Sequence, residues 1–321
     1  MGERVVAVAI GRNEGERLVR CLAALSAQGL PIVYVDSGST DASIAEAEKV
    51  GATVLEIDLS VPFTAARARN AGWAKALEIS PDAAFIQFLD GDCELDPGWI
   101  PAALAAFEAD PDLAAVCGRR REKFPDETRW NRMIDAEWGA APAGPAKACG
   151  GDALIRVAAL KAVDGYREDL IAGEEPEMCY RMRQKGWKIL RLAEEMTLHD
   201  AAMTRFGQWW QRSRRAGHTY AEGVAIHGAG PERYRIPELR RSLIWGLGLP
   251  VVTLLGLLII GPWALLLLLA YPAQVLRLSQ RMSLEAAFFL TLGKFSETQG
   301  ALGYWAGRLA GVKRRKLIEY K

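Results

Sequence analysis

The sequence predicts an α/β protein in which an open, doubly wound sheet of parallel strands is followed by a helical, membrane-associated C-terminal region. Two observations support this prediction. Short apolar runs alternate with segments of helical periodicity over residues 5–90. Residues 243–276 then carry no charge at all, and an apolar run of that length is typical of a membrane segment.

The first two strands and the helix between them are expected to form a βαβ unit. The apolar runs at residues 5–11 and 29–36 predict strands that are buried on both faces. Between them, apolar residues recur at helical spacing, namely Leu18, Cys21, Leu22 and Leu25. A strand, a helix and a strand in this order place the two strands parallel in one sheet.

The same pattern repeats further along the chain. Two more pairs of a helix and a strand are expected, over residues 41–51, 52–59, 64–79 and 83–90. In open α/β sheets, ligands bind outside the carboxyl ends of the strands. Because Asn13, Asp36 and Asp90 fall at such ends, we expect the functional site at this edge of the sheet.

Charge and cysteine content narrow the class of protein. The 321 residues include 40 basic and 39 acidic ones, which leaves a formal net charge of +1 and argues against general nucleic-acid binding. The five cysteines lie far apart without metal-binding spacing, so we interpret them as reduced thiols in a cytosolic domain. The first apolar run is too short for a signal peptide.

We expect two domains, a soluble one over residues 1–225 and a membrane-associated helical one over residues 226–321. Gly261-Pro262 lies near the middle of the uncharged stretch, where proline breaks or kinks a helix. Basic residues, which favour the cytoplasmic side, flank the stretch at both ends. These residues are Arg240, Arg241, Arg277, Arg281 and the KRRK tail at 313–316. We therefore predict an apolar hairpin over 243–278, with a single tilted span as the alternative.

The segment FLDGDCELDPGW, residues 88–99, concentrates carboxylates at the end of the fourth expected strand. Asp90 and Asp92 flank one glycine, and carboxylates at this spacing can turn their oxygens toward one hard cation. A solvated loop is the alternative interpretation, because Asp, Gly and Pro are turn formers.

Five segments in order resemble family 2 glycosyltransferases, whose catalytic domain has the nucleotide-sugar-binding, Rossmann-like GT-A fold. They are AIGRNE at 9–14, VDSGSTD at 35–41, RARNAGW at 67–73, LDGD at 89–92 and GEEPEMCYRMRQKGW at 173–187. The resemblance spans most of residues 5–200. It implies an inverting enzyme with a nucleotide-sugar donor and a divalent metal, Mg²⁺ or Mn²⁺.

The donor suggests roles for several residues. A nucleoside diphosphate needs hydrogen bonds for its base and positive charge for its phosphates. We expect Asp36 to accept from a base N–H, and Arg67 and Arg69 to face the phosphates. The other residues expected to contact the nucleotide sugar are Asn13, Glu14, Asn70, Asp90, Gly151 and Asp152. For Asp152, capping of a helix is the alternative.

The metal and the base follow from the resemblance. Asp92 matches the second carboxylate of the D-x-D motif, which binds the cation, with Asp90 beside the metal, the sugar or the ribose. His199 lies where many relatives place a third ligand, although a lone histidine with a structural role is the alternative. Inversion needs a base to take the acceptor's proton. Glu175 is the preferred candidate and Glu174 the second, unless both merely complement a helix dipole.

These observations predict a glycosyltransferase at the cytosolic face of a membrane. We expect a UDP-linked sugar as the donor and a lipid-linked or other glycan as the acceptor during surface polysaccharide assembly, with membrane lipids as partners. A metal-dependent phosphatase or nucleotidyltransferase using Asp90 and Asp92 is the alternative enzyme. A membrane-anchored carbohydrate binder is the non-catalytic alternative.

Overall fold

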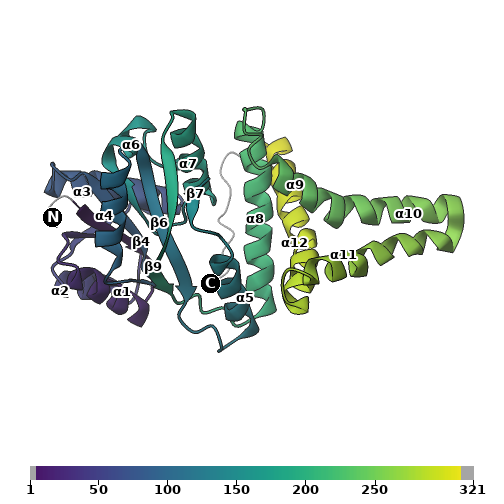
Figure 1. Ribbon diagram of the computed structural model, residues 1–321, viewed down its shortest axis with the longest axis horizontal. Coiled ribbons are helices and arrows are strands. Elements are labelled where there is room, and N and C mark those ends of the chain that lie inside the picture. The colour runs from purple at the N-terminus through teal and green to yellow at the C-terminus, as the bar shows by residue number, and fades with distance from the viewer. Residues whose placement is uncertain (1–4, 312–321) are drawn as a thin grey trace. The chain divides into compact units, whose positions relative to one another are not determined.

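The structure is a computed structural model, and it describes residues 5–311. The chain divides into two compact units, Met1–Ala202 and Met203–Lys321. The N-terminal unit is an α/β domain and the C-terminal unit is helical (Figure 1). The division lies earlier than the expected boundary after residue 225, because the helix α8 (Phe206–His227) packs along α12 (Leu284–Leu309) in the C-terminal unit.

The described part of the N-terminal unit contains one mixed sheet. Its strands are β1 (Val5–Gly11), β2 (Ile32–Asp36), β3 (Thr53–Glu56), β4 (Phe85–Asp90), β5 (Cys93–Leu95), β6 (Leu113–Glu122), β7 (Gly144–Ala146), β8 (Ala153–Arg156) and β9 (Lys188–His199). They follow the order β3-β2-β1-β4-β8-β6-β9-β5, and β7 pairs with β9. The first four in this order are parallel, which confirms the parallel half predicted from the sequence. The other half is mixed: β8 is antiparallel to both β4 and β6, whereas β6 and β9 are parallel.

Helices pack against this sheet and complete its core. They are α1 (Glu16–Ala27), α2 (Ser43–Lys49), α3 (Ala65–Ile79), α4 (Trp99–Ala109), α5 (Arg129–Gly139), α6 (Val157–Ala162) and α7 (Glu174–Gln184). The four residues predicted to share the buried face of α1 are all fully buried, namely Leu18, Cys21, Leu22 and Leu25. The first strand is buried along nearly its whole length, as its continuous apolar run predicted.

Glycine allows very close helix packing in the C-terminal unit. A side-chain carbon added at Gly300 of α12 would lie 1.9 Å from the carbonyl oxygen of Arg214, and one added at Gly217 of α8 would lie 1.8 Å from that of Glu297. The two backbones therefore approach to a distance at which no larger residue fits.

The uncharged stretch folds back on itself at Gly261. The helical run that contains this stretch comprises α9 (Ile236–Leu243), the π-helical turn Ile244–Gly248 and α10 (Leu249–Ile260), then the 3-10 segment Gly261–Leu269 and α11 (Ala270–Ser279). Gly261 ends α10 with φ of 61°, which favours glycine. The hydroxyl of Tyr271 donates to the carbonyl of Trp245 at 2.7 Å, so the two arms lie side by side (Figure 1). The KRRK tail lies outside the described residues.

Candidate active site

The candidate site begins at the carboxyl ends of the parallel strands. Asp36 ends β2 and Asp90 ends β4, and both strands pair with β1. In the sheet register, Asp36 lies beside Gly11 and Asp90 lies beside Ile10. The predicted location at this edge thus follows directly from the parallel topology.

Arg69 of α3 joins three carboxylates from distant parts of the chain. Its side chain is 3% exposed, and it donates to Asp90 at 2.8 Å and to Glu174 at 2.8 Å. Glu175 lies 3.1 Å from the same guanidinium. Burial alone would lower the pKa of Arg69, but the charges of Glu175, Asp90 and Glu174 outweigh it and raise this pKa. We call Arg69, Asp90, Glu174 and Glu175 the arginine cluster.

The two glutamates differ in accessibility. Both lie in the first turn of α7, where the helix dipole favours negative charge. The side chain of Glu175 is 16% exposed, whereas that of Glu174 is 5% exposed. Burial, followed by the neighbouring charge of Glu174, raises the pKa of Glu175 to about 7. Glu175 is thus the better placed of the two to exchange a proton near neutral pH.

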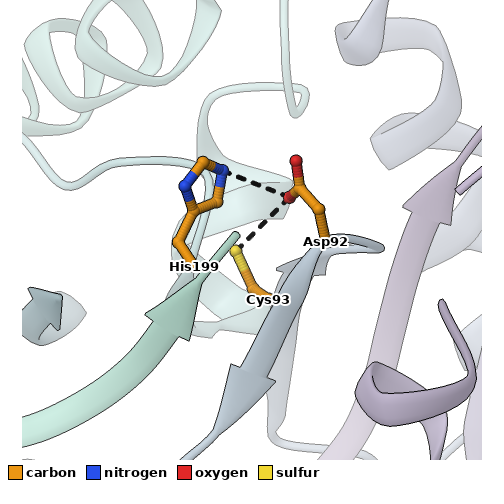
Figure 2. A group of neighbouring side chains, drawn as sticks. All are labelled: Asp92, Cys93 and His199. Carbon is orange, nitrogen blue, oxygen red and sulfur yellow. Dashed lines mark hydrogen bonds and ion pairs between the residues drawn. The ribbon is translucent and has the colours of Figure 1, made fainter. Parts of the chain in front are cut away.

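Asp92 and His199 form a second group, shown in Figure 2. His199 ends β9, and its Nε2 lies 3.3 Å from the Oδ1 of Asp92. Burial, with a smaller contribution from Arg120, lowers the pKa of His199 to about 4, so the ring is neutral at pH 7. A carboxylate and a neutral imidazole that converge in this way are suitable ligands for a divalent cation. Asp90 bonds Arg69 in the arginine cluster, and its expected role as a further metal ligand stays a prediction.

Cys93 lies in the same group, with its Sγ 3.5 Å from Asp92 (Figure 2). Metals bind the thiolate rather than the thiol. Burial, followed by the charge of Asp152, raises the pKa of Cys93 well above its usual range. Without a cation, the thiol therefore stays protonated and donates to Asp92.

Asp152 has an internal role that the sequence did not indicate. Its fully buried carboxylate contacts Arg120 at 2.5 Å and accepts from Thr197 at 2.9 Å. It also accepts from the backbone N–H of Asp90 at 3.3 Å. The helix-capping alternative is wrong, because α6 begins at Val157 with Arg156 as its N-cap. Contact with a sugar stays a prediction.

The sequence did not mark Arg120 as a residue of the site. It lies within the run GRRRE of β6, where three consecutive arginines look alike. In the structure its side chain is 18% exposed, bonds Asp152, approaches Asp90 at 3.9 Å and lies over the ring of Trp138. Strand alternation could not have singled it out reliably, because the pairing of β6 with β9 shifts register between Arg119 and Arg120.

Gly151 precedes Asp152 and permits a close approach of the backbone to the arginine cluster. An added side-chain carbon would lie 2.5 Å from the guanidinium of Arg69 and 2.8 Å from Asp90. Gly151 was expected to contact the nucleotide sugar. In the structure it makes room for the ion pair between Arg69 and Asp90, and its contact with a substrate stays a prediction.

The loops after β1 and β2 are joined by hydrogen bonds. Asn13 accepts from the backbone N–H of Thr40 at 2.7 Å, while Glu14 pairs with Arg17 at 2.7 Å. The buried carboxylate of Asp36 accepts from Tyr34 and from the backbone N–H groups of Gly38 and Ser39. These contacts shape the loops, and the expected contacts of Asn13, Glu14 and Asp36 with the nucleotide stay predictions.

Arg67 and Asn70 lie on another side of α3. The guanidinium of Arg67 donates to the carbonyls of Val61, Pro62 and Asp58, and Asn70 bonds the backbone of Tyr166 in both directions. Both residues line an open pocket of about 450 Å³, whose other lining residues are Leu55, Glu56, Ile57, Asp58, Ala71 and Glu168. The structure therefore does not bring Arg67 or Asn70 into the arginine cluster, and their expected contacts with the donor stay predictions.

Comparison with known proteins identifies the N-terminal unit. Residues 8–162 match the model of Glycosyl transferase family 2. The N-terminal unit is thus similar to family 2 glycosyltransferases over most of its length. The chain is also 27% identical over 228 residues to the pre-mycofactocin glycosyltransferase of Mycobacterium tuberculosis. That match covers 67% of this chain but 46% of the relative, so the chain spans about half the length of that relative.

The fold of the glycosyltransferase is confirmed by a solved structure. The mannosyltransferase PcManGT from Pyrobaculum calidifontis, in complex with GDP-Man and Mn²⁺, superposes with a TM-score of 0.59. The match covers 94% of this chain and 87% of that one, at 17% identity. The predicted α/β fold of the GT-A type is thus confirmed, and the match to the family model supports the predicted enzyme class. The phosphatase and nucleotidyltransferase alternatives are not favoured.

Proposed function

We propose that this glycosyltransferase moves a sugar, with inversion, from a nucleotide-sugar donor to an acceptor hydroxyl. The observation that carries the proposal is the juxtaposition of two groups at one sheet edge, the arginine cluster and the pair Asp92–His199. The first supplies a carboxylate whose pKa is raised to about 7. The second supplies oxygen and nitrogen ligands for a cation.

Asp92 and His199 would hold the divalent metal, Mn²⁺ or Mg²⁺. Their ligand atoms converge at 3.3 Å, both side chains are buried, and the imidazole is neutral. A mixed set of one carboxylate and one imidazole fits Mn²⁺ better than Mg²⁺, which prefers oxygen ligands. When bound, the cation would stabilise the negative charge of the departing diphosphate.

Glu175 would act as the general base. Its carboxylate takes the proton from the acceptor hydroxyl as that oxygen attacks the anomeric carbon, on the face opposite to the leaving group. Arg69 holds the carboxylate at 3.1 Å and fixes its position before the acceptor arrives. Glu174 shares the same guanidinium, and its charge keeps the pKa of Glu175 near working pH.

The test measures release of the nucleoside diphosphate from a panel of UDP-, GDP-, ADP- and dTDP-linked sugars, first with Mn²⁺ and then with excess EDTA. We expect a UDP-sugar to be used and EDTA to stop the reaction. The proton NMR spectrum of the product reports its anomeric configuration. A product that retains the donor's configuration would contradict the role of Glu175, and full activity in EDTA would contradict the metal site.

The C-terminal hairpin would insert into the bilayer from the cytosolic side and return, which places the active site near a lipid-linked acceptor. The helical run Ile236–Ser279 is long and apolar enough to cross a membrane, with a mean hydropathy of 2.5 over its most apolar window. Near the bend, Leu258 and Ile259 are 83% and 82% exposed. Each arm of about 18 residues is about 27 Å long, slightly less than the bilayer's hydrocarbon thickness of about 30 Å.

Vesicle flotation tests the insertion. The double variant Leu258→Asp/Ile259→Asp is expected to lose most co-flotation with phospholipid vesicles, because it places two charges at the tip of the hairpin. The matched control is Ile79→Asp, an exposed apolar position on α3, and it should float like the unchanged protein. Undiminished flotation of the double variant would contradict insertion of the hairpin.

A further inference from the structure

The two ring nitrogens of His199 face two different carboxylates. The Nε2 atom lies 3.3 Å from Asp92, and the Nδ1 atom lies 4.0 Å from the Oε2 of Glu122. The Glu122 side chain is fully buried, and burial raises its pKa. A buried carboxylate behind a histidine that faces a candidate cation site calls for an explanation, because burying a charge is costly.

Glu122 is held firmly in this position. It ends β6 directly opposite His199 in the register of the β6–β9 pair. One carboxylate oxygen accepts from the backbone N–H of Phe124 at 3.1 Å and lies 3.4 Å from the amide nitrogen of Asn131. The other oxygen accepts from the backbone N–H of Ala201 at 3.1 Å. The oxygen nearest to His199 is thus fixed by the segment that directly follows this histidine.

A third contact restrains the imidazole. The ring of Trp138 on α5 packs edge to face against that of His199, with centroids 4.7 Å apart and an interplanar angle of 82°. The imidazole therefore has a carboxylate at each nitrogen and an aromatic ring against it. This environment leaves the ring little freedom to turn its Nε2 away from Asp92.

We propose that Glu122 is the positioning residue of the candidate metal site: it accepts the Nδ1–H of His199 and thereby directs the Nε2 lone pair to a cation beside Asp92. The distance of 4.0 Å is about 1 Å longer than a hydrogen bond, so the proposal requires a small shift of the ring toward the fixed carboxylate when the cation binds. A carboxylate behind a ligating histidine fixes its tautomer and raises its basicity. The inference rests on the metal site of the proposed function.

Calorimetric titration of the full chain with Mn²⁺ tests the proposal without an activity assay. Glu122→Gln should weaken Mn²⁺ binding by about 10- to 100-fold, as for other residues that support a metal ligand. In the His199→Gln background, Glu122→Gln should cause no further loss. The matched control is Asn131→Ala, which removes a partner of the other oxygen of Glu122 and should leave Mn²⁺ affinity unchanged. Unchanged affinity in Glu122→Gln, or a loss that persists without His199, would overturn the proposal.

The histidine tautomer gives a second readout in the unchanged protein. Long-range ¹H–¹⁵N spectra of the ¹⁵N-histidine-labelled chain with saturating Mg²⁺ should show His199 as the neutral Nδ1–H form, identified by its loss in His199→Gln. The Nε2–H form would overturn the role of Glu122. If Mn²⁺ binding does not depend on Asp92, the metal site fails and this inference with it. If binding depends on Asp92 but not on Glu122, only this inference fails.

Discussion

Replacing Glu175 by glutamine tests the proposed base most directly. Glutamine has the same shape and keeps an oxygen that can accept from Arg69, now 3.1 Å away, but it cannot take a proton. Turnover should fall by roughly 10²-fold or more, the usual contribution of a general base. The affinity for the donor should change little, because proton transfer matters only in the transition state.

The pH dependence sharpens this prediction. The pKa of Glu175 is raised to about 7, mainly by burial, and the base works in its deprotonated form. The deprotonated fraction of such a group rises from about one tenth at pH 6 to about nine tenths at pH 8, so kcat/KM should rise roughly tenfold over this range. In Glu175→Gln the residual rate should lack this rise.

The assay is release of the nucleoside diphosphate at saturating donor and subsaturating acceptor, which reports kcat/KM for the acceptor, measured from pH 5.5 to pH 8.5. Glu175→Asp is the matched comparison, because it keeps a carboxylate and should retain both a pH-dependent rise and part of the turnover. Glu177→Gln controls for the helix, since Glu177 lies in the same first turn of α7 but pairs with Arg181. Wild-type turnover in Glu175→Gln, or an unaltered pH rise there, would transfer the role to Glu174 or remove the base hypothesis.

Three further predictions follow from other parts of the structure. Asp92→Ala should nearly abolish both transfer and Mn²⁺ binding, and tight Mn²⁺ binding by this variant would contradict the assigned ligand. Gly300→Ala should lower the free energy of unfolding by roughly 1–3 kcal/mol, because the added methyl group meets the backbone of α8. Gly303→Ala is the control: its added methyl group meets nothing within 4 Å, so this variant should be as stable as the unchanged protein or more stable. Cysteines at positions 236 and 281 should both react with an impermeant maleimide only from the cytosolic side. The five native cysteines are buried, and labelling of position 281 from outside would replace the hairpin by a single span.

Local patterns predicted the parallel half of the sheet well. The continuous apolar run of β1 and the helical spacing of α1 are properties of neighbouring residues, and the burial of Leu22 and Leu25 followed from them. Parallel strands then had to bring Asp36 and Asp90 to one edge. The approximate location of the site was therefore already contained in the order of strands and helices.

Contacts between distant segments could not be predicted in the same way. Arg69 meets Glu174 across 105 positions of the chain, and Glu122 meets His199 through the pairing of β6 with β9. Nothing in the local sequence distinguishes Arg67, which holds a loop, from Arg69, which holds the cluster. Their separation depends on which face of α3 each occupies and on the loops that pack there.

In the sequence Asp90-Gly91-Asp92, the backbone directs two carboxylates to different partners. Asp90 is the last residue of β4, and its neighbours Gly91 and Asp92 form a turn before β5. The N–H of Gly91 donates to the carbonyl of Ile10 at 2.8 Å, and a side-chain carbon at this position would lie 3.1 Å from that oxygen. This turn, packed against β1, separates the carboxylates, so that Asp90 joins Arg69 and Asp92 joins His199. Asp90 is paired with a permanent cation of the protein, whereas Asp92 lies beside a neutral imidazole, where the proposed divalent cation would stabilise a departing diphosphate.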